Sequence, residues 1–415
     1  MQGALRRLTA RRRAALPIVV CLAALAGAAT ATAAPQPPSG LPARAWILVD
    51  ADDGEVLAAH RASSSYSIAS TTKLMTAYVA RRELGLHDEV VAPPYDALPA
   101  ESLLGLAAGE RIEVRDLLYG LLLVSGNDAA EALAQAAAGS EDAFVGQMNR
   151  AAKKLGLGDT TYANPIGLDE PGNNSSAEDL ADLAVKLRRD KLFRRIFDTP
   201  ETVISSGAHP RDLVNRNVLV RTVPFVNGVK TGYTLDAGNV LVASGEQKGV
   251  ELVSAVLGAP SESERDSATM TLLDYGFSLY HRRTPVKRQE ALARVAIKDR
   301  DISVPLAPAR DLRVTVRRGQ NLQTRVRAPA EVDGPVSGGE RMGQVVVSID
   351  GEPVARAPLA ATRGAAAASL LERYDAKIPG PRAVAWGVAI LALAVAFIGG
   401  HAIWDRRRKI LRERA

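Results

Sequence analysis

The chain has few of the residues that build disulfide frameworks and metal centres. Its 415 residues include one cysteine, Cys21, and five histidines. One cysteine excludes an internal disulfide framework, a Cys-based metal site and a Cys-x-x-Cys redox pair. The histidines are scattered and give no pattern of a metal centre. We therefore expect no metal and no cofactor.

Aromatic residues are also scarce. They make up 4% of the chain, so the cores have to be built from Leu, Val, Ile and Ala. A hydrophobic content of 47% with 24% charged residues is typical of a globular protein, and it excludes disorder over most of the chain. The length suits two or three domains.

The net charge is +6, but the basic excess lies at the two ends. Residues 1–33 carry five arginines and no acidic residue, and residues 405–415 carry six basic residues against Asp405 and Glu413. Subtracting +5 and +4 from +6 leaves −3 for residues 34–404. Basic ends around a mildly acidic body are typical of membrane topology, and we expect no nucleic-acid partner.

The N-terminal segment has the pattern of a secretory signal. An arginine-rich start is followed by an apolar run over residues 14–29 and by Ala31-Thr32-Ala33. Small residues in this arrangement predict a signal peptide at 1–33 with cleavage near Ala33; an uncleaved signal anchor is the alternative. Cys21 lies inside the apolar run without the small residues that precede a lipidated cysteine, so we expect it to be lost with the signal.

The C-terminal segment predicts a membrane span. Residues 383–404 are 22 positions without a charged side chain, and about 20 are enough to cross a bilayer. The tetrabasic run 406–409 follows at once, and positive residues stay on the cytoplasmic side. We expect a single-pass protein of the cell membrane with an extracytoplasmic ectodomain and a basic cytoplasmic tail at 405–415. A buried soluble helix would not carry that tetrabasic run.

The pattern between the two ends indicates an α+β domain at 34–285. A β-hairpin is predicted at 45–50 and 55–59, around the turn residues Asp52, Asp53 and Gly54. Helices are predicted at 70–84, 114–124, 128–138 and 141–155, and further strands at 218–220, 240–244 and 251–257. This order favours helices packed on an antiparallel sheet.

The character changes near Arg282. Short alternating runs at 312–316 and 343–349, with turns at 333–335 and 350–351, predict a small all-β domain at 286–362. It contains no cluster of potentially catalytic residues. A stem at 363–382 follows, with a short helix expected over 361–377.

Three short segments carry candidate chemistry. In Ser70-Thr71-Thr72-Lys73, the serine and lysine are three residues apart and lie on one helix face, so the amine can reach the hydroxyl. A lysine can activate a serine if burial and nearby positive charge lower its pKa. Alone, this motif is weak, because it occurs about once by chance in a chain of ordinary composition.

The second and third segments supply polar groups for a substrate. Ser125-Gly126-Asn127 follows an apolar run in a loop between two predicted helices, where a hydroxyl and an amide can relay a proton and hold an amide. By itself it also suits a helix-capping turn. Lys230-Thr231-Gly232 lies at the edge of a predicted strand; Lys and Thr offer donors to a carboxylate, and Gly permits a close backbone approach.

These motifs occur in the order known from penicillin-binding proteins and class A β-lactamases, 55 and 160 residues after Ser70. The chain resembles the low-molecular-mass penicillin-binding proteins that are serine-type D-alanyl-D-alanine carboxypeptidases, from about Ala45 to Pro358. Further matching segments are 117–120, 125–130, 148–149, 164–168 and 230–234. The resemblance implies a β-lactamase/DD-peptidase-like antiparallel sheet with helices, followed by the family's C-terminal β domain.

The resemblance also implies residue roles. Ser70 is the acylated nucleophile and Lys73 its general base, and Ser125 and Asn127 complete the proton relay and substrate cradle. The backbone amides of Ser70 and Tyr233 form the oxyanion hole. The substrate-binding residues implied by the family are Lys230, Thr231, Gly232, Arg216, which matches the arginine directed at the terminal carboxylate, and Arg265, which matches a second arginine. Surface ion pairs are the alternative for the two arginines.

The implied substrate is the peptidoglycan stem peptide, from which a terminal D-alanine is removed, and β-lactam antibiotics are the implied covalent inhibitors. Three features depart from the family pattern. Asn227 stands where Asp is usual and Ser67 where Pro is frequent, and a full span replaces the usual amphipathic anchor. None of the three removes a catalytic group.

Two alternatives stay open from the sequence. A class A-like β-lactamase would need a deacylating glutamate, and Glu170 lies at roughly the right distance along the chain. The middle motif is Ser-Gly-Asn rather than Ser-Asp-Asn, however, and a β domain with a span has no use in a lactamase. A catalytically inactive wall-binding scaffold is the other alternative, and nothing favours it while every catalytic side chain is present.

Overall fold

The computed structural model describes residues 35–375 and 382–412. The predicted signal peptide at 1–33, with Cys21, therefore lies outside the described residues. The chain divides into two compact units, one ending at His281 and the other beginning at Arg282. Each unit is described by itself below.

The first unit is built on a five-stranded antiparallel sheet in the order β2-β1-β11-β10-β9. All six residues of the inner strand β1 are buried, as expected for a strand covered on both faces. The predicted hairpin and the two later strand predictions are confirmed. The strand bounds are β1 Ala45–Asp50, β2 Val56–His60, β9 Val226–Thr234, β10 Gly238–Gln247 and β11 Val250–Ala259.

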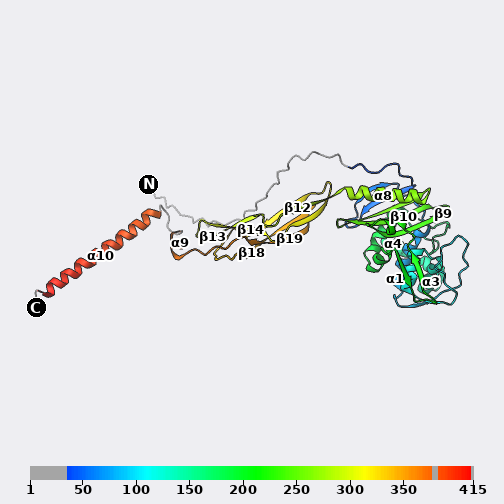
Figure 1. The fold of residues 1–415 in the computed structure, drawn as a ribbon, viewed down its shortest axis with the longest axis horizontal. Helices are drawn as coiled ribbons and strands as arrows, with labels where there is room; N and C mark the ends of the chain where they lie inside the picture. The colour runs from blue at the N-terminus through cyan, green and yellow to red at the C-terminus, as the bar shows by residue number, and fades with distance from the viewer. Residues whose placement is uncertain (1–34, 376–381, 413–415) are drawn as a thin grey trace, which may run out of the picture. The chain divides into compact units, whose positions relative to one another are not determined.

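Helices cover both faces of this sheet (Figure 1). Alternate residues of β1 belong to different cores: Ile47 and Val49 pack with the helices of one face, and Trp46 and Leu48 pack with α8 (Glu262–Ser278) on the other. This alternation follows from the two-residue period of a strand.

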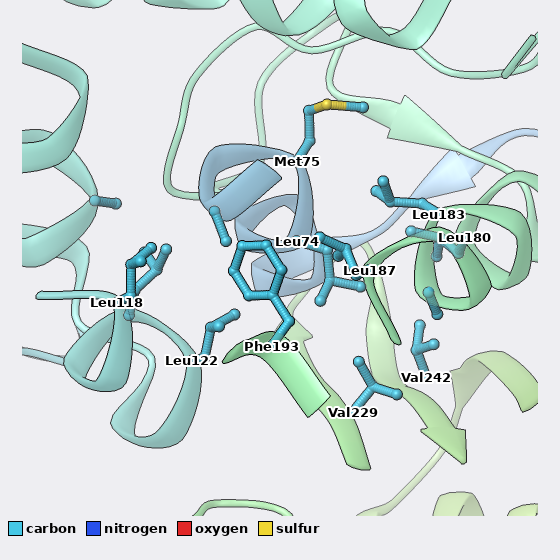
Figure 2. Close-up of a cluster of buried hydrophobic side chains, with 14 of the residues drawn as sticks. Leu74, Met75, Leu118, Leu122, Leu180, Leu183, Leu187, Phe193, Val229 and Val242 are labelled. Atoms are coloured by element: carbon cyan, nitrogen blue, oxygen red, sulfur yellow. The ribbon is translucent and has the colours of Figure 1, made fainter. Parts of the chain in front are cut away.

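The larger core lies between the sheet and a layer of helices (Figure 2). Phe193 lies there with Leu74, Leu122 and Val229. The elements of this layer are η1 Ala69–Thr72, α1 Lys73–Glu83, α2 Val114–Tyr119, the π-helix η2 Gly120–Val124, α3 Asn127–Ala138, α4 Glu141–Leu155, α5 Ala177–Arg188 and α6 Lys191–Phe197. Because α1 is packed inside this core, the residues at its start are held in a fixed place.

The strand predicted at 218–220 is wrong. Residues Val218–Thr222 form a short helix, α7, because the side chain of Asn217 caps its N-terminus and accepts a hydrogen bond from the Leu219 amide. Three two-stranded pairings complete the unit: β3 Tyr66–Ser67 with β6 Asn174–Ser175, β4 Glu89–Val91 with β5 Arg111–Glu113, and β7 Glu201–Ile204 with β8 Arg211–Val214.

The second unit contains the predicted all-β domain. Its main sheet has the order β16-β18-β19-β14-β13-β17, and β12 pairs with β15. A separate core of aliphatic residues, including Val295, Leu306, Val345 and Leu359, holds it together. The strand bounds are β12 Tyr280–Val286, β13 Ala293–Ile297, β14 Ser303–Pro308, β15 Leu312–Arg317, β16 Leu322–Arg327, β17 Glu331–Val332, β18 Arg341–Ile349 and β19 Glu352–Ala361.

The helix predicted over 361–377 is largely wrong within the described residues. Strand β19 continues to Ala361, and Ala365 exchanges two backbone hydrogen bonds with Val336, of 2.7 and 2.9 Å. These bonds outweigh the helix propensity of the alanine-rich stretch, and only α9, Leu370–Asp375, is helical. The last helix, α10 (Arg382–Arg412), contains the window Gly387–Trp404, which is long and apolar enough to cross a membrane.

Candidate active site

The Ser70 hydroxyl and the Lys73 amine lie together at the start of α1. Lys73 Nζ is 3.0 Å from Ser70 Oγ and also donates to the Ile166 carbonyl. The turn that presents Ser70 contains Ala69 with φ 49°, a left-handed conformation that costs a non-glycine residue energy and is often found at functional sites. The predicted serine–lysine contact is therefore present in the fold.

Lys73 is fully buried, which decides its charge. Burial lowers the pKa of Lys73 to about 7, because the ammonium form loses its hydration. Arg216 acts in the same direction, whereas the carboxylates of Glu101 and Asp128 raise the pKa of Lys73. A substantial fraction of this amine is neutral near pH 7, as a general base requires.

The Ser125–Asn127 turn follows the π-helix η2. Ser125 adopts φ 67° and ends that helix, so the chain reverses into α3 at Asn127. The Ser125 hydroxyl is buried and has no hydrogen-bond partner among the described residues. An unpartnered buried hydroxyl is costly unless a ligand or water completes it, which fits a group that acts on a bound substrate.

A loop between β4 and β5 is fastened to this turn. The Asp128 carboxylate accepts from the amides of Leu104, Gly105 and Leu106 at 2.7, 2.8 and 2.9 Å. The backbone N–H of Asn127 donates to the Ser102 carbonyl, with an N···O distance of 2.8 Å. The loop therefore forms one wall beside Asn127.

The same loop brings Glu101 to the side chain of Asn127. Asn127 Nδ2 donates to Glu101 Oε2 at 2.7 Å, and the Tyr95 hydroxyl donates to the same oxygen. Partial burial opposes ionisation, but these hydrogen bonds outweigh it and hold the pKa of Glu101 below its usual range. Glu101 is therefore an anion near neutral pH.

Strand β9 forms the opposite wall. A Cβ on Gly232 would lie 3.0 Å from the Ser70 backbone nitrogen and 3.1 Å from the Ile68 carbonyl oxygen. Gly232 thus lets strand β9 lie close to the Ser70 turn. The sequence motif predicts instead that the glycine makes room for the backbone of the substrate. The approach places the Ser70 amide beside the residue that precedes Tyr233.

Lys230 and Thr231 lie in the same stretch of β9. Lys230 is fully buried and donates from Nζ to the Thr231 carbonyl at 2.9 Å. Burial lowers the pKa of Lys230 well below its usual range. The positive charges that act in the same direction are, in order of effect, Lys73, Arg216 and Arg265.

The two predicted arginines have different surroundings. Arg216 is exposed and donates from Nε to the Val124 carbonyl at 2.8 Å, next to Ser125. Among the described residues its two Nη groups have no partner, so a ligand carboxylate can approach them. Arg265 is buried on α8 and is paired with Asp266 at 2.9 Å; it acts on Lys230 through its charge. The surface ion-pair alternative fits neither arginine, because Arg216 has no acidic partner there and Arg265 is not at the surface.

The glutamate of the lactamase alternative is not among the charged groups that shift the pKa of Lys73. Glu170 is exposed and accepts a hydrogen bond from Asn164 at 2.9 Å. The acidic residues that influence Lys73 are Glu101 and Asp128. The contacts of Glu170 therefore give the lactamase alternative no support.

Sequence reasoning missed Glu101 and Tyr95. They lie in a loop without a recognisable motif, and only the folded chain brings them to Asn127. Asp128 and Ile166 could have been found from the sequence, because both residues lie inside segments that match the family pattern.

Comparison with known proteins agrees with this geometry. The family described as D-alanyl-D-alanine carboxypeptidase matches residues 30–261, more than half of the chain. The chain belongs to the D-alanyl-D-alanine carboxypeptidase family. The β domain matches a second family, the C-terminal domain of penicillin-binding protein 5, over residues 280–365.

Several relatives of this carboxypeptidase family member match about three quarters of the chain or more. D-alanyl-D-alanine carboxypeptidase DacF of Bacillus subtilis is 32% identical over 77% of this chain and 85% of its own length. DacC of Escherichia coli is 36% identical over 76% and 82%. The crystal structure of penicillin binding protein 5 from Haemophilus influenzae has a TM-score of 0.57 at 28% identity, over 79% of this chain and 98% of that one. A mutant of the Streptomyces K15 DD-transpeptidase has a TM-score of 0.56 at 30% identity, over 58% and 100%.

The buried lysine predicts a pH-dependent effect on stability. The pKa of Lys73 is about 7 when folded and near 10.5 when unfolded, so the unfolded chain binds more protons between these values. The free energy of unfolding should therefore lose roughly 1.4 kcal/mol per pH unit from this group as pH falls from 9 to 7. Lys73→Met removes this term, so its Tm relative to wild type should rise as pH falls.

The measurement is thermal unfolding of the wild-type and the Lys73→Met ectodomain at pH 6, 7.5 and 9. The expected result is a Tm difference that favours Lys73→Met most at pH 6. A difference independent of pH would mean that Lys73 keeps an ordinary pKa in the fold.

Proposed function

We propose that this member of the D-alanyl-D-alanine carboxypeptidase family removes the terminal D-alanine of peptidoglycan stem peptides through an acyl-enzyme on Ser70. The observation that carries the proposal is the 3.0 Å contact between Ser70 Oγ and a buried lysine whose pKa is about 7. A serine hydroxyl needs such a base to become a nucleophile at neutral pH. No metal or cofactor has a part in the proposed steps.

The reaction has two halves. Neutral Lys73 takes the Ser70 proton as Oγ attacks the carbonyl carbon of the D-Ala–D-Ala bond. The resulting oxyanion accepts hydrogen bonds from the Ser70 and Tyr233 amides, which stabilise the transition state by a few kcal/mol. The proton then passes through Ser125 to the leaving amine, D-alanine departs, and water hydrolyses the ester to return Ser70 and the shortened peptide.

Recognition of the substrate rests on positive charge. A peptide that ends in D-alanine carries a free carboxylate, and Arg216 offers two Nη donors in a fork that matches it. Lys230 and Thr231 supply further donors from β9, while Asn127 holds the peptide amide. Arg265, which is buried and paired with Asp266, supports this carboxylate site through its charge.

The same groups account for inhibition by β-lactams. Penicillins carry a carboxylate next to a reactive amide, so they fit the Arg216 side of the site and acylate Ser70. Ring opening leaves no departing fragment, so the ester persists when water cannot reach it. A class A-like lactamase function is not favoured, because Glu170 bonds Asn164 and is not among the charged groups that shift the pKa of the base.

Helix α10 supports a placement of the enzyme at the membrane. Its apolar window Gly387–Trp404 supports a single span, and the basic run that follows favours a cytoplasmic C-terminus. The ectodomain then faces outward, where peptidoglycan is. In this arrangement residues 34–285 hold all the chemistry, and the β domain at 286–362 and the stem at 363–382 connect them to the membrane.

A direct test is mass spectrometry of the ectodomain on a stem pentapeptide. We expect loss of one D-alanine, and stoichiometric labelling of Ser70 by penicillin. Ser70→Ala should abolish both, with its fold unchanged. A wild-type protein that binds pentapeptide without cleaving it and takes no penicillin label would favour the scaffold alternative, and rapid multiple turnover of nitrocefin would favour a lactamase.

Arg216→Ala tests the carboxylate contact. Loss of a hydrogen bond to a charged group should cost roughly 1.5–3 kcal/mol in kcat/KM for a peptide ending in D-Ala-D-Ala. The matched control is the same peptide with an amidated C-terminus, whose slow hydrolysis should barely change because it lacks the charge. Equal losses on both peptides would show that Arg216 supports the fold instead of reading the substrate.

A further inference from the structure

Glu101 is not one of the residues that the three motifs supply, yet its carboxylate bonds a motif side chain, that of Asn127. Oε1 accepts from the Leu98 amide at 3.0 Å, and Oε2 accepts from Asn127 and from the Tyr95 hydroxyl. Three donors thus fix both oxygens of one carboxylate. A carboxylate fixed in this way also fixes the position of the Asn127 side chain that it binds.

The contact settles the orientation of the Asn127 amide. An ionised carboxylate can only accept hydrogen bonds, so the atom of Asn127 that faces Glu101 has to be the nitrogen. The carbonyl oxygen Oδ1 and the second N–H of Asn127 then face away from Glu101. With the amide reversed, Oδ1 would meet the carboxylate, and two acceptors repel each other.

The charge of Glu101 also acts on the base. The charged groups that influence Lys73 are Glu101 from the loop, Asp128 from α3 and Arg216 after β8, and Lys230 of β9 is itself affected by Lys73. The positive charge of Arg216 therefore lowers the pKa of Lys73, and the two carboxylates oppose that effect. Asp128 is occupied by three backbone amides of the loop, whereas Glu101 is bonded to a motif side chain.

We propose that Glu101 is a positioning residue of this active site, which holds the Asn127 amide in its working orientation and balances the positive charge around Lys73. Tyr95 assists by holding the carboxylate. The inference rests on the proposed carboxypeptidase function, because it assigns the residue a part in that reaction.

The main test is the pH profile of kcat/KM for Glu101→Gln on the D-Ala-D-Ala peptide. Glutamine keeps the shape and one acceptor but removes the charge. Without that charge the ammonium form of Lys73 is less favoured, so the acid limb should move to lower pH, by up to roughly one pH unit. On the plateau above the limb, kcat/KM should fall roughly tenfold, because the hydrogen bond to Asn127 is weakened.

Glu101→Asp separates the two effects. It retains the charge, so the acid limb should stay close to that of the wild type, but its shorter side chain should not hold Asn127 and the plateau should still fall. Glu83→Gln is the matched control: Glu83 is exposed at the far end of α1, roughly 15 Å along the helix from Lys73, and its removal should change neither limb nor plateau.

Coupling to Asn127 gives a second measurement. If Glu101 acts through that amide, adding Glu101→Gln to Asn127→Ala should lower the plateau far less than it does in the wild type. If kcat/KM falls by the same factor at every pH and the acid limb of the profile does not move, Glu101 only orders the loop. That result would overturn the proposal. Accumulation of acyl-enzyme at an unchanged acylation rate would also overturn it, by assigning Glu101 to activation of the hydrolytic water.

These outcomes are distinct from a failure of the proposed function. Penicillin labelling of Ser70 and D-alanine release by the wild type establish the reaction first. If the wild type does neither, the carboxypeptidase assignment is wrong. If the wild type does both and Glu101→Gln matches it in limb and plateau, only the role of Glu101 is wrong.

Discussion

The active site depends on one buried contact, the approach of the Lys73 amine to the Ser70 hydroxyl. Burial removes hydration from the ammonium and leaves a base that titrates near neutral pH. The helical core around α1 makes this possible, because it places a lysine where its amine bonds the Ser70 hydroxyl and the Ile166 carbonyl. The fold bears the cost of burying an ionisable group at the place where the chemistry needs it.

The surroundings of that contact divide by charge. Beyond the effect of burial, the charge of Arg216 lowers the pKa values of Lys73 and Lys230, while Asp128 and Glu101 fasten the opposite loop and limit how far the pKa of Lys73 falls. Two glycines, Gly167 and Gly232, pack against the Ser70 turn from other segments of the chain. A side chain on Gly167 or Gly232 would collide with the backbone of that turn, so the walls can close on the nucleophile only where no Cβ is present.

Much of this could be predicted from the sequence. The hairpin, the later strands, the all-β domain and the three motifs carry local signals, and spacing alone placed Lys73 on the same helix face as Ser70. The failures were of two kinds. At Val218 the β-branched residues suggested a strand, but an asparagine cap decided for a helix, and at Ala365 long-range pairing with Val336 overrode helix propensity. Glu101 and Tyr95 were missed because loop residues reach Asn127 only through tertiary structure, which no local pattern records.

The central claim is that a substantial fraction of Lys73 is neutral near physiological pH in the resting enzyme. Its most direct test is an NMR titration of Lys73 in the Ser70→Ala ectodomain, with lysine ε-carbons labelled by ¹³C and the Lys73→Arg spectrum used for assignment. The account predicts a lysine that titrates near pH 7, well below the range in which exposed lysines titrate. A Lys73 resonance that titrates above pH 9 would contradict it, because the amine would then be protonated whenever the enzyme has to act.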